Sequence, residues 1–244
     1  MKINKEIWAF IPARSGSKGL KNKNIKLFMK KPLLAHSIIV AKKIALVKKV
    51  VFSSDSKSYC KIAAKYGCRD FHLRSNKVSH DSASEYSVFE EFIKKNIKKK
   101  NVLPKYFLHL RPTSPIRNSK TIEKAIKFFL KNEKNYTSLR SSNLMENPAY
   151  RSYRIINGKL CSLSGKDYKV GNYSQRRQLY PKTYKSGNLF EIYKTKNILK
   201  GDLWGNKSAA FITEDLFNDV DTKDDFDYLE YYLKKNRKKL KKYN

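Results

Sequence analysis

The chain has 244 residues, 40% hydrophobic and 13% aromatic, so it can bury the core of one folded domain. No run approaches the ~20 apolar residues of a membrane-spanning helix and the N-terminus lacks an apolar signal segment, so we expect a cytoplasmic protein without membrane contact. The three cysteines, an odd number without a Cys-x-x-Cys pair, argue against a disulfide framework and against a thiolate metal site.

The formal net charge is +33 and the isoelectric point is near 10.0, values common among nucleic-acid-binding proteins. Only 11 of the 54 basic residues are arginines, and the lysines are spread along the whole chain. Recognition of nucleic acids favours arginine forks beside aromatic stacking platforms. We therefore expect no specific nucleic-acid partner and attribute most of the charge to a compositional bias toward lysine.

The first predicted element is a short buried strand over residues 7–11, which leads into the basic loop IPARSGSKGLKNKN at 11–24. Small residues let a backbone turn tightly and direct its N–H groups at an anion, and the lysines and arginine neutralise that anion. The loop matches neither standard phosphate fingerprint. Because α/β proteins hold nucleotide phosphates on such strand-to-loop junctions, we predict a phosphate site here, the alternative being a solvated, lysine-rich turn.

Apolar periodicity predicts the elements that follow. In order they are a helix at 32–43, a strand at 49–52, a helix at 57–66, a strand at 70–73, a polar loop at 74–84, a helix at 85–97, a strand at 106–110 and a helix at 119–130. Strands that alternate with helices predict an α/β fold with a mostly parallel sheet flanked by helices.

The pattern changes at 136–184, where short alternating segments and an Asn-Gly turn at 157–158 predict a hairpin-rich insert. A strand at 189–193 and a lysine-ended helix at 224–242 complete the chain. We therefore expect a single domain over 1–244 that carries a small insert.

Polar loops follow the predicted strands, where ligands bind α/β sheets. One later segment, Asn-Asp-Val-Asp-Thr, places Asp219 and Asp221 on alternate residues. In extended backbone alternate residues point the same way, so the two carboxylates can share one Mg²⁺ ion. The alternative is that they start and cap the helix after Thr222, and the spacing alone leaves both interpretations open. The four histidines form no His-x-x-x-His pair, which makes zinc chemistry improbable.

Taken together, four ordered blocks resemble the CMP-sialic acid synthetases, also called acylneuraminate cytidylyltransferases. The blocks are IPARSGSKGLKNKN at 11–24, RPTSPIR at 111–117, RRQLYPKTYKSGNLFEIY at 176–193 and DVDTKDDF at 219–226, with SSDS at 53–56 and HDSAS at 80–84 fitting between them. The resemblance covers nearly the whole chain. It implies a mononucleotide-binding, nucleotidyltransferase-like sheet of the Rossmann type, in a homodimer formed through the insert.

The resemblance also implies the reaction and its residues. A nine-carbon 2-keto sugar acid attacks the α-phosphate of CTP, which releases pyrophosphate and gives a CMP-sugar, with Mg²⁺ as cofactor. Arg14, Lys18 and Lys23 match triphosphate positions, Gly16, Ser17 and Gly19 complete the loop, and Asn24, Arg74 and Ala83 line the cytidine site. Asp219 and Asp221 match the metal ligands, and Arg111, Arg177 and Lys185 fall at the sugar. Arg14, Lys23 and Asp221 are the expected catalytic residues, with Asp221 as our hypothesis for the proton acceptor.

One departure concerns the sugar. Many members of the family have a glutamine where this chain has Arg111, and that glutamine helps to read the sugar. The arginine therefore makes a bacterial acid such as legionaminic or pseudaminic acid at least as plausible as N-acetylneuraminate. Two other functions stay open: CMP activation of the eight-carbon acid KDO, whose synthetases usually lack the S-K-G-x-x-x-K-N loop, and RNA binding, which leaves Asp219 and Asp221 without a task.

Overall fold

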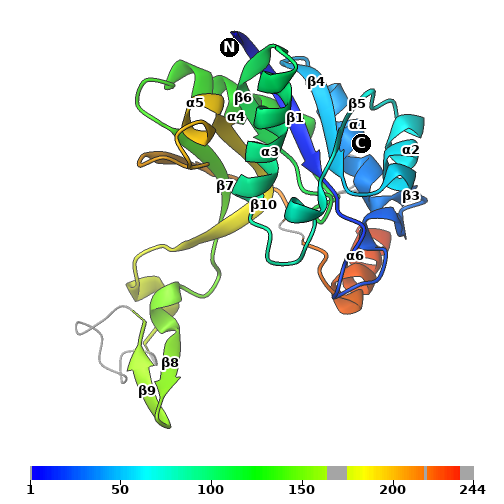
Figure 1. Ribbon diagram of the computed structural model, residues 1–244. Coiled ribbons are helices and arrows are strands. Elements are labelled where there is room, and N and C mark those ends of the chain that lie inside the picture. The colour runs from blue at the N-terminus through cyan, green and yellow to red at the C-terminus, as the bar shows by residue number, and fades with distance from the viewer. Residues whose placement is uncertain (1, 164–174, 217–218, 237–244) are drawn as a thin grey trace.

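The computed structural model describes residues 2–163, 175–216 and 219–236. Its centre is a seven-stranded sheet in the order β11-β7-β10-β6-β1-β4-β5 (Figure 1). The strands are β1 (Ile3–Pro12), β4 (Val47–Ser54), β5 (Asp70–Leu73), β6 (Leu103–His109), β7 (Ser138–Leu144), β10 (Tyr184–Lys194) and β11 (Ser208–Ile212). Neighbouring strands are parallel except at β10, which runs antiparallel to both β6 and β7. The predicted α/β fold with a mostly parallel sheet is confirmed.

Helices cover both faces of the sheet (Figure 1). Helices α1 (Leu33–Lys43), α2 (Lys57–Lys65) and α4 (Ser119–Lys131) pack on one face, and α3 (Glu85–Lys98) and the short α5 (Thr195–Ile198) pack on the other. Their buried positions recur at helical spacing, as in α4, where every core residue lies on one stripe. Within the described residues, no helix has the length and apolar character needed to cross a membrane.

In the core, aromatic residues of α3 pack against aromatic residues of the two central strands. Phe10 of β1 lies 4.3 Å from Phe89 of α3, measured between ring centroids, and Phe107 of β6 meets both rings edge to face. All three side chains are essentially inaccessible to solvent. Burying each phenylalanine contributes about 2–3 kcal/mol, so this cluster fixes α3 against the sheet just beside the ends of β1 and β6.

The order of the strands creates a switch point between β1 and β6. From β1 the chain moves through α1 to β4 on one side, and it later returns to β6 on the other side of β1. The loops that leave the carboxyl ends of these two strands therefore diverge, which is where open α/β sheets bind ligands. The basic loop after β1 and the RPTSPIR segment after β6, at 111–117, both lie at this edge.

Helix α6 (Lys223–Lys235) lies below the same edge of the sheet in Figure 1. Phe226, Leu229 and Leu233 of α6 form a separate apolar cluster with Leu20 and Phe28 from the region of the basic loop. The short pair β2 (Leu27–Phe28) and β3 (Lys31–Pro32) belongs to this region. The predicted end of the C-terminal helix, beyond 236, lies outside the described residues.

The insert projects away from the body of the molecule (Figure 1). It contains the hairpin of β8 (Tyr153–Ile156) and β9 (Lys159–Ser162), joined at Asn157 and Gly158, whose positive φ angles of 50° and 74° suit the predicted two-residue turn. Short 3₁₀ helices at Ala149–Arg151 and Arg177–Leu179 flank it, and others lie at Lys23–Ile25 and Asn76–Val78. Because β7 is part of the main sheet, the hairpin region begins later than the predicted 136. Residues 164–174 of that region lie outside the described residues.

Candidate active site

The basic loop after β1 is held in shape by the end of β4. The Ser15 backbone N–H and hydroxyl both donate to the carboxylate of Asp55 at 2.8 Å, and the Asn24 side-chain amide donates to the Arg14 carbonyl at 2.9 Å. The loop borders a cavity of about 420 Å³ at the switch point. The predicted nucleotide residues that line this cavity are Arg14, Ser17, Lys18, Gly19, Lys23, Asn24, Arg74 and Ala83. Gly16 does not line it.

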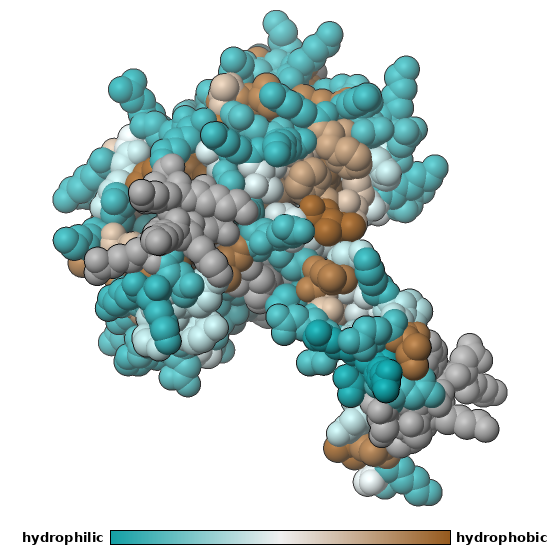
Figure 2. Space-filling view, turned by 180° about the vertical axis from the view of Figure 1, so that it is seen from behind, coloured by the Kyte–Doolittle hydropathy of each residue, from teal (hydrophilic) through white to brown (hydrophobic). Residues whose placement is uncertain are grey.

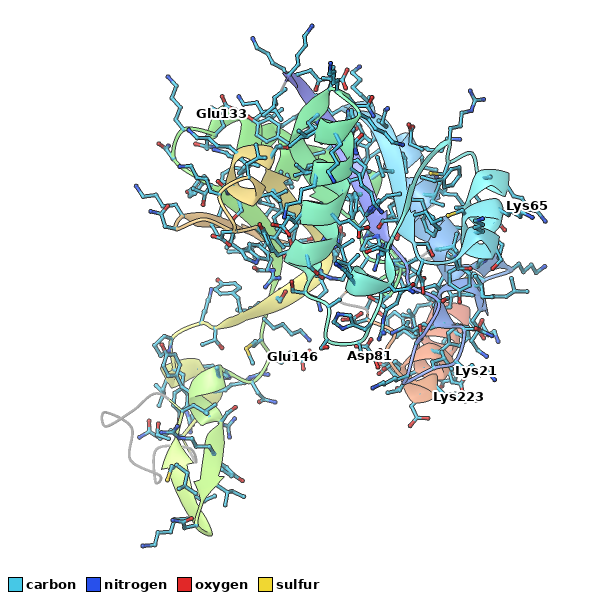
Figure 3. All side chains as sticks on the ribbon, in the orientation of Figure 1. Lys21, Lys65, Asp81, Glu133, Glu146 and Lys223 are labelled. Carbon is cyan, nitrogen blue, oxygen red and sulfur yellow. The ribbon has the colours of Figure 1, made fainter. Side chains whose placement is uncertain are left out.

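Two cations of the loop share one carboxylate. Lys18 Nζ lies 2.5 Å from Asp81 Oδ2, and Arg14 Nη1 contacts Asp81 Oδ1. Hydrogen bonds from Lys18 and Arg14 lower the pKa of Asp81, so its carboxylate is charged at neutral pH. Figure 3 shows Asp81 and Lys21 at the end of the molecule opposite Glu133, where β1 and β6 finish. The two cations are therefore spaced to hold one anionic group.

The segment with the paired aspartates borders the cavity next to the start of α6. Lys23 Nζ lies 2.8 Å from Asp221 Oδ1, and the Val220 N–H donates to the Thr113 carbonyl at 2.8 Å. The cap of α6 is made by other residues: Thr222 Oγ1 accepts from the Asp225 N–H, and the Asp225 carboxylate accepts from the Thr222 N–H. Since this capping box serves the helix, neither Asp219 nor Asp221 is needed as its cap.

The two aspartates differ in their surroundings. The Asp221 side chain is 69% exposed and lines the cavity, whereas Asp219 does not line it. Asp219 Oδ2 accepts a hydrogen bond of 2.9 Å from the Asn188 amide. Its Oδ1 is buried and has no hydrogen-bond partner within the part of the chain that the structure describes. A buried carboxylate oxygen without a partner is unfavourable, so this atom favours a bound cation.

Arg74 forms the wall at the end of β4 and β5. Its Nε donates to the Ser53 hydroxyl at 2.9 Å and its Nη2 donates to the Ser53 carbonyl at 3.1 Å. Burial lowers the pKa of Arg74 to about 10, which still leaves the guanidinium charged at neutral pH. Ala83 lines the same cavity without adding bulk.

Arg111 lies in the turn after β6 and is enclosed by carboxylates. Its Nε and Nη2 donate to Glu85 at 2.6 and 2.8 Å, and its Nη1 donates to both oxygens of Glu191 at 2.7 and 2.8 Å. Glu191 is fully buried and also contacts His109 Nδ1 at 3.1 Å and Arg140 Nη2 at 3.3 Å. Burial alone would raise the pKa of Glu191, but the hydrogen bond from His109 and the charge of Arg111 lower it to about 2.

Arg117, the last residue of the RPTSPIR block, fixes the loop that carries Arg111. Its side chain is buried and donates to the carbonyls of Leu189, Ser114 and Arg111. These bonds tie the loop after β6 to β10, so the position of Arg111 is set from both strands.

The other predicted sugar residues lie elsewhere. Arg177 is in the 3₁₀ helix of the insert and Lys185 is near the start of β10, and neither lines the cavity. Sequence reasoning assigned no role to Asp81, Glu85 or Glu191. A charged residue inside the apolar strand pattern at 189–193 was the available signal for Glu191, since a buried carboxylate needs a cationic partner.

A basic loop at the switch point of a mostly parallel sheet, facing an acidic segment, is the arrangement expected of a nucleotide-binding α/β protein. The chain belongs to the cytidylyltransferase family, whose profile matches residues 8–193. It is therefore a nucleotidyltransferase that uses CTP, and the predicted family is confirmed.

Relatives extend the match over the whole chain. The chain is 31% identical over 238 residues to post-translational flagellin modification protein B of Campylobacter coli, covering 97% of this chain and 98% of that protein. It is 34% identical over 242 residues to N-acylneuraminate cytidylyltransferase of Escherichia coli O18:K1:H7, covering 98% of this chain but 55% of that longer protein. It is 28% identical over 229 residues to pseudaminic acid cytidylyltransferase of Campylobacter jejuni, covering 93% and 95% of the two chains.

Solved structures share the fold. A CMP:2-keto-3-deoxy-manno-octonic acid synthetase complexed with CTP superposes with a TM-score of 0.70 at 15% identity, covering 94% of this chain and 99% of that one. The 4-diphosphocytidyl-2C-methyl-D-erythritol synthase of Anaerococcus prevotii superposes with a TM-score of 0.63 at 12% identity, covering 94% and 96%. At these identities the likeness concerns the fold alone.

Proposed function

We propose that the chain is a CMP-nonulosonate synthetase, which transfers CMP from CTP to the anomeric hydroxyl of a nine-carbon 2-keto sugar acid. Membership of the cytidylyltransferase family accounts for the use of CTP. Relatives named for N-acylneuraminate and pseudaminic acid support a nine-carbon sugar acid as the second substrate. The observation that carries the proposal is that the basic loop, the Arg74 wall and the Asp221 segment line one and the same cavity.

The basic loop is suited to the triphosphate. Arg14 and Lys18 already share the Asp81 carboxylate, and a phosphate group can take its place between them. Lys23, whose side chain is only 12% exposed, extends from the loop to Asp221. A cation in a partly dehydrated site neutralises developing phosphate charge more effectively than one in water.

A divalent cation fits the acidic segment. The buried Asp219 Oδ1 lacks a hydrogen-bond partner among the described residues, and Asp221 lines the cavity two residues later. Carboxylates together with phosphate oxygens are the ligands that Mg²⁺ prefers, so Asp219 and Asp221 would hold it. When bound, the ion would polarise the phosphates of CTP.

In the proposed reaction the anomeric oxygen forms a bond to the α-phosphorus of CTP. The bond from that phosphorus to the bridging oxygen breaks, pyrophosphate leaves with the electron pair, and the hydroxyl proton is released. The protein aligns the two substrates and neutralises charge. Asp221, a partly exposed carboxylate oriented by Lys23, is the proposed proton acceptor.

We also propose that two copies of the chain associate through the insert. The space-filling view shows apolar residues exposed among polar ones along this projecting arm (Figure 2). The exposed apolar side chains of this region are Tyr153, Ile155, Ile156, Leu160, Leu163, Leu179 and Tyr184. A two-stranded hairpin is marginally stable alone, so a partner that covers these residues would stabilise it. Arg177 and Lys185 would then act at the interface, away from their own chain's cavity.

The function is tested by incubating the protein with CTP, Mg²⁺ and single sugar acids, and by measuring pyrophosphate release. The panel contains N-acetylneuraminic, N,N'-diacetyllegionaminic and pseudaminic acids, with KDO as the competing substrate. We expect release with at least one nine-carbon acid and little with KDO. Release with KDO alone, or with none of the acids, would reject the proposal. An RNA-binding role instead predicts binding that weakens with salt and ignores CTP.

A further inference from the structure

Glu85 places a carboxylate on the wall of the cavity. It is the first residue of α3, after the N-cap Ser84, where the helix dipole stabilises a negative charge. Its side chain is 40% exposed and lines the cavity beside Val88 and Phe89. A polar group held in a fixed direction on the wall of a cavity usually sets the orientation of a ligand.

Arg111 fixes the direction of this carboxylate. Each oxygen of Glu85 accepts one hydrogen bond from the planar guanidinium, at 2.6 and 2.8 Å, while the third guanidinium nitrogen is used by the fully buried Glu191. All three nitrogens of Arg111 therefore donate to carboxylates of the protein. A ligand at this wall therefore meets the carboxylate oxygens of Glu85, which accept hydrogen bonds. The Arg111 guanidinium is already neutralised by Glu85 and Glu191.

Arg111 and Arg140 supply two positive charges to the cluster, and Glu85 and Glu191 supply two negative charges. His109 Nδ1 also faces Glu191. Because Arg111 already donates to two carboxylates, it is not a free cation for the carboxylate of a sugar acid. Each Glu85 oxygen keeps a lone pair that can accept a hydrogen bond from a hydroxyl or an amide N–H.

The cluster lies on the β6 side of the switch point. Arg74, which the family resemblance places at the cytidine, is hydrogen-bonded to the end of β4, on the opposite side of β1. Glu85 is held by Arg111, which follows β6, and Arg111 is held in turn by Glu191 within β10, on the other side of β1. With the nucleotide placed at the Arg74 wall, as the proposed function requires, a ligand that contacts Glu85 from the β6 side would be the acceptor substrate.

We propose that Glu85 is a specificity-determining residue for the acceptor, which accepts a hydrogen bond from a hydroxyl or acylamido N–H of the sugar acid. In this proposal Arg111 positions Glu85 and does not itself bind the carboxylate of the sugar acid. The inference rests on the proposed synthetase function.

The test compares Glu85→Ala and Glu85→Gln with the wild type, using the nine-carbon acid that the wild type turns over best. We expect Glu85→Ala to raise the KM for the sugar acid at least about 10-fold while the KM for CTP changes less than about 2-fold. Glu85→Gln, which keeps one acceptor oxygen, should fall between them. Glu90→Ala is the matched control, because Glu90 lies on the same helix but does not line the cavity, and it pairs with Lys94 and Tyr86.

The positioning role of Arg111 is tested by a double-mutant cycle. Lysine cannot form the two forked contacts that Arg111 makes. We therefore expect Arg111→Lys to raise the KM for the sugar acid when it is the only substitution, but to raise it little further when Glu85→Ala is already present. Additive effects would overturn the positioning role. An unchanged KM for the sugar acid in Glu85→Ala, or an equal rise in both KM values, would overturn the assignment of Glu85. A wild type that releases no pyrophosphate with any acid would instead reject the synthetase function itself.

Discussion

Gly19 packs against the main chain of Asp221 so closely that a Cβ atom at Gly19 would lie 2.5 Å from the Asp221 carbonyl oxygen. The two residues come from opposite ends of the sequence. Their approach brings the basic loop onto the acidic segment, and the 2.8 Å ion pair between Lys23 and Asp221 forms beside it. The glycine is therefore a packing requirement of the site.

Gly19→Ala should separate the loop from the acidic segment, because a backbone oxygen cannot move aside as a flexible side chain can. We expect kcat/KM for CTP to fall about 10- to 100-fold, since small misplacements of reacting groups are costly. Gly16→Ala is the matched control: a Cβ there has no atom within 4 Å, so activity should be kept. Steady-state kinetics of the two variants checks this, and equal losses in both would contradict the packing argument.

Lys23→Met should remove the cation that pairs with Asp221 and that we propose to bind the triphosphate. Lys23 is only 12% exposed, so its charge acts in a poorly solvated position, and we expect kcat to fall about 100-fold or more. Lys21→Met changes an exposed lysine of the same loop and should leave kcat nearly unchanged. A similar loss in both variants would mean that only the overall charge of the loop matters.

Asp219→Asn should weaken the binding of Mg²⁺. The substitution keeps the shape of the side chain but removes the negative charge beside the buried oxygen, so we expect half-maximal activity to need about 10-fold more Mg²⁺. Chelation by EDTA should abolish turnover of the wild type, and added Mg²⁺ should restore it. Asp224→Asn, an exposed residue in the first turn of α6, is the control. The same Mg²⁺ dependence in all three proteins would remove Asp219 from the metal site.

The local motifs of the site could be predicted from the sequence because each is a continuous stretch. The basic loop follows an apolar strand, and all its predicted residues except Gly16 line the cavity. The partners of Arg111 could not be predicted in this way. Glu191 is 80 positions away and Glu85 is 26, and only the packing of β10 and α3 on β6 brings them together.

Strand β7 was missed for a related reason. Strand β7 has the sequence SLRSSNL, which lacks an apolar run. Its buried serines are satisfied across the sheet: the Ser138 and Ser208 hydroxyl oxygens lie 2.5 Å apart, and Ser141 Oγ accepts from the Leu189 N–H at 3.2 Å. Such long-range pairing makes buried hydroxyls tolerable, and it leaves no periodic signal in the sequence.

The pair of His72 and Glu91 predicts how stability depends on pH. His72 Nε2 lies 3.0 Å from Glu91 Oε1, and burial lowers the pKa of His72 from 6.5 to about 4 in the folded chain. Between these values the unfolded chain binds more protons, so the free energy of unfolding rises with pH there. We expect about 2–3 kcal/mol of stability to be lost as the pH falls from about 6.5 to about 4.

Urea unfolding at a series of pH values measures this loss. In His72→Gln the slope between pH 6.5 and pH 4 should flatten, whatever the stability of the variant at neutral pH, because the titrating group is gone. His80→Gln, at an exposed histidine, should keep the wild-type slope. Glu91 adds a second loss at lower pH: burial alone would raise its pKa, but bonds from Lys95 and Ser75 lower it from 4.5 to about 2, so its contribution disappears as the pH falls below 4.5. An unchanged slope in His72→Gln would show that the acid sensitivity arises at other groups.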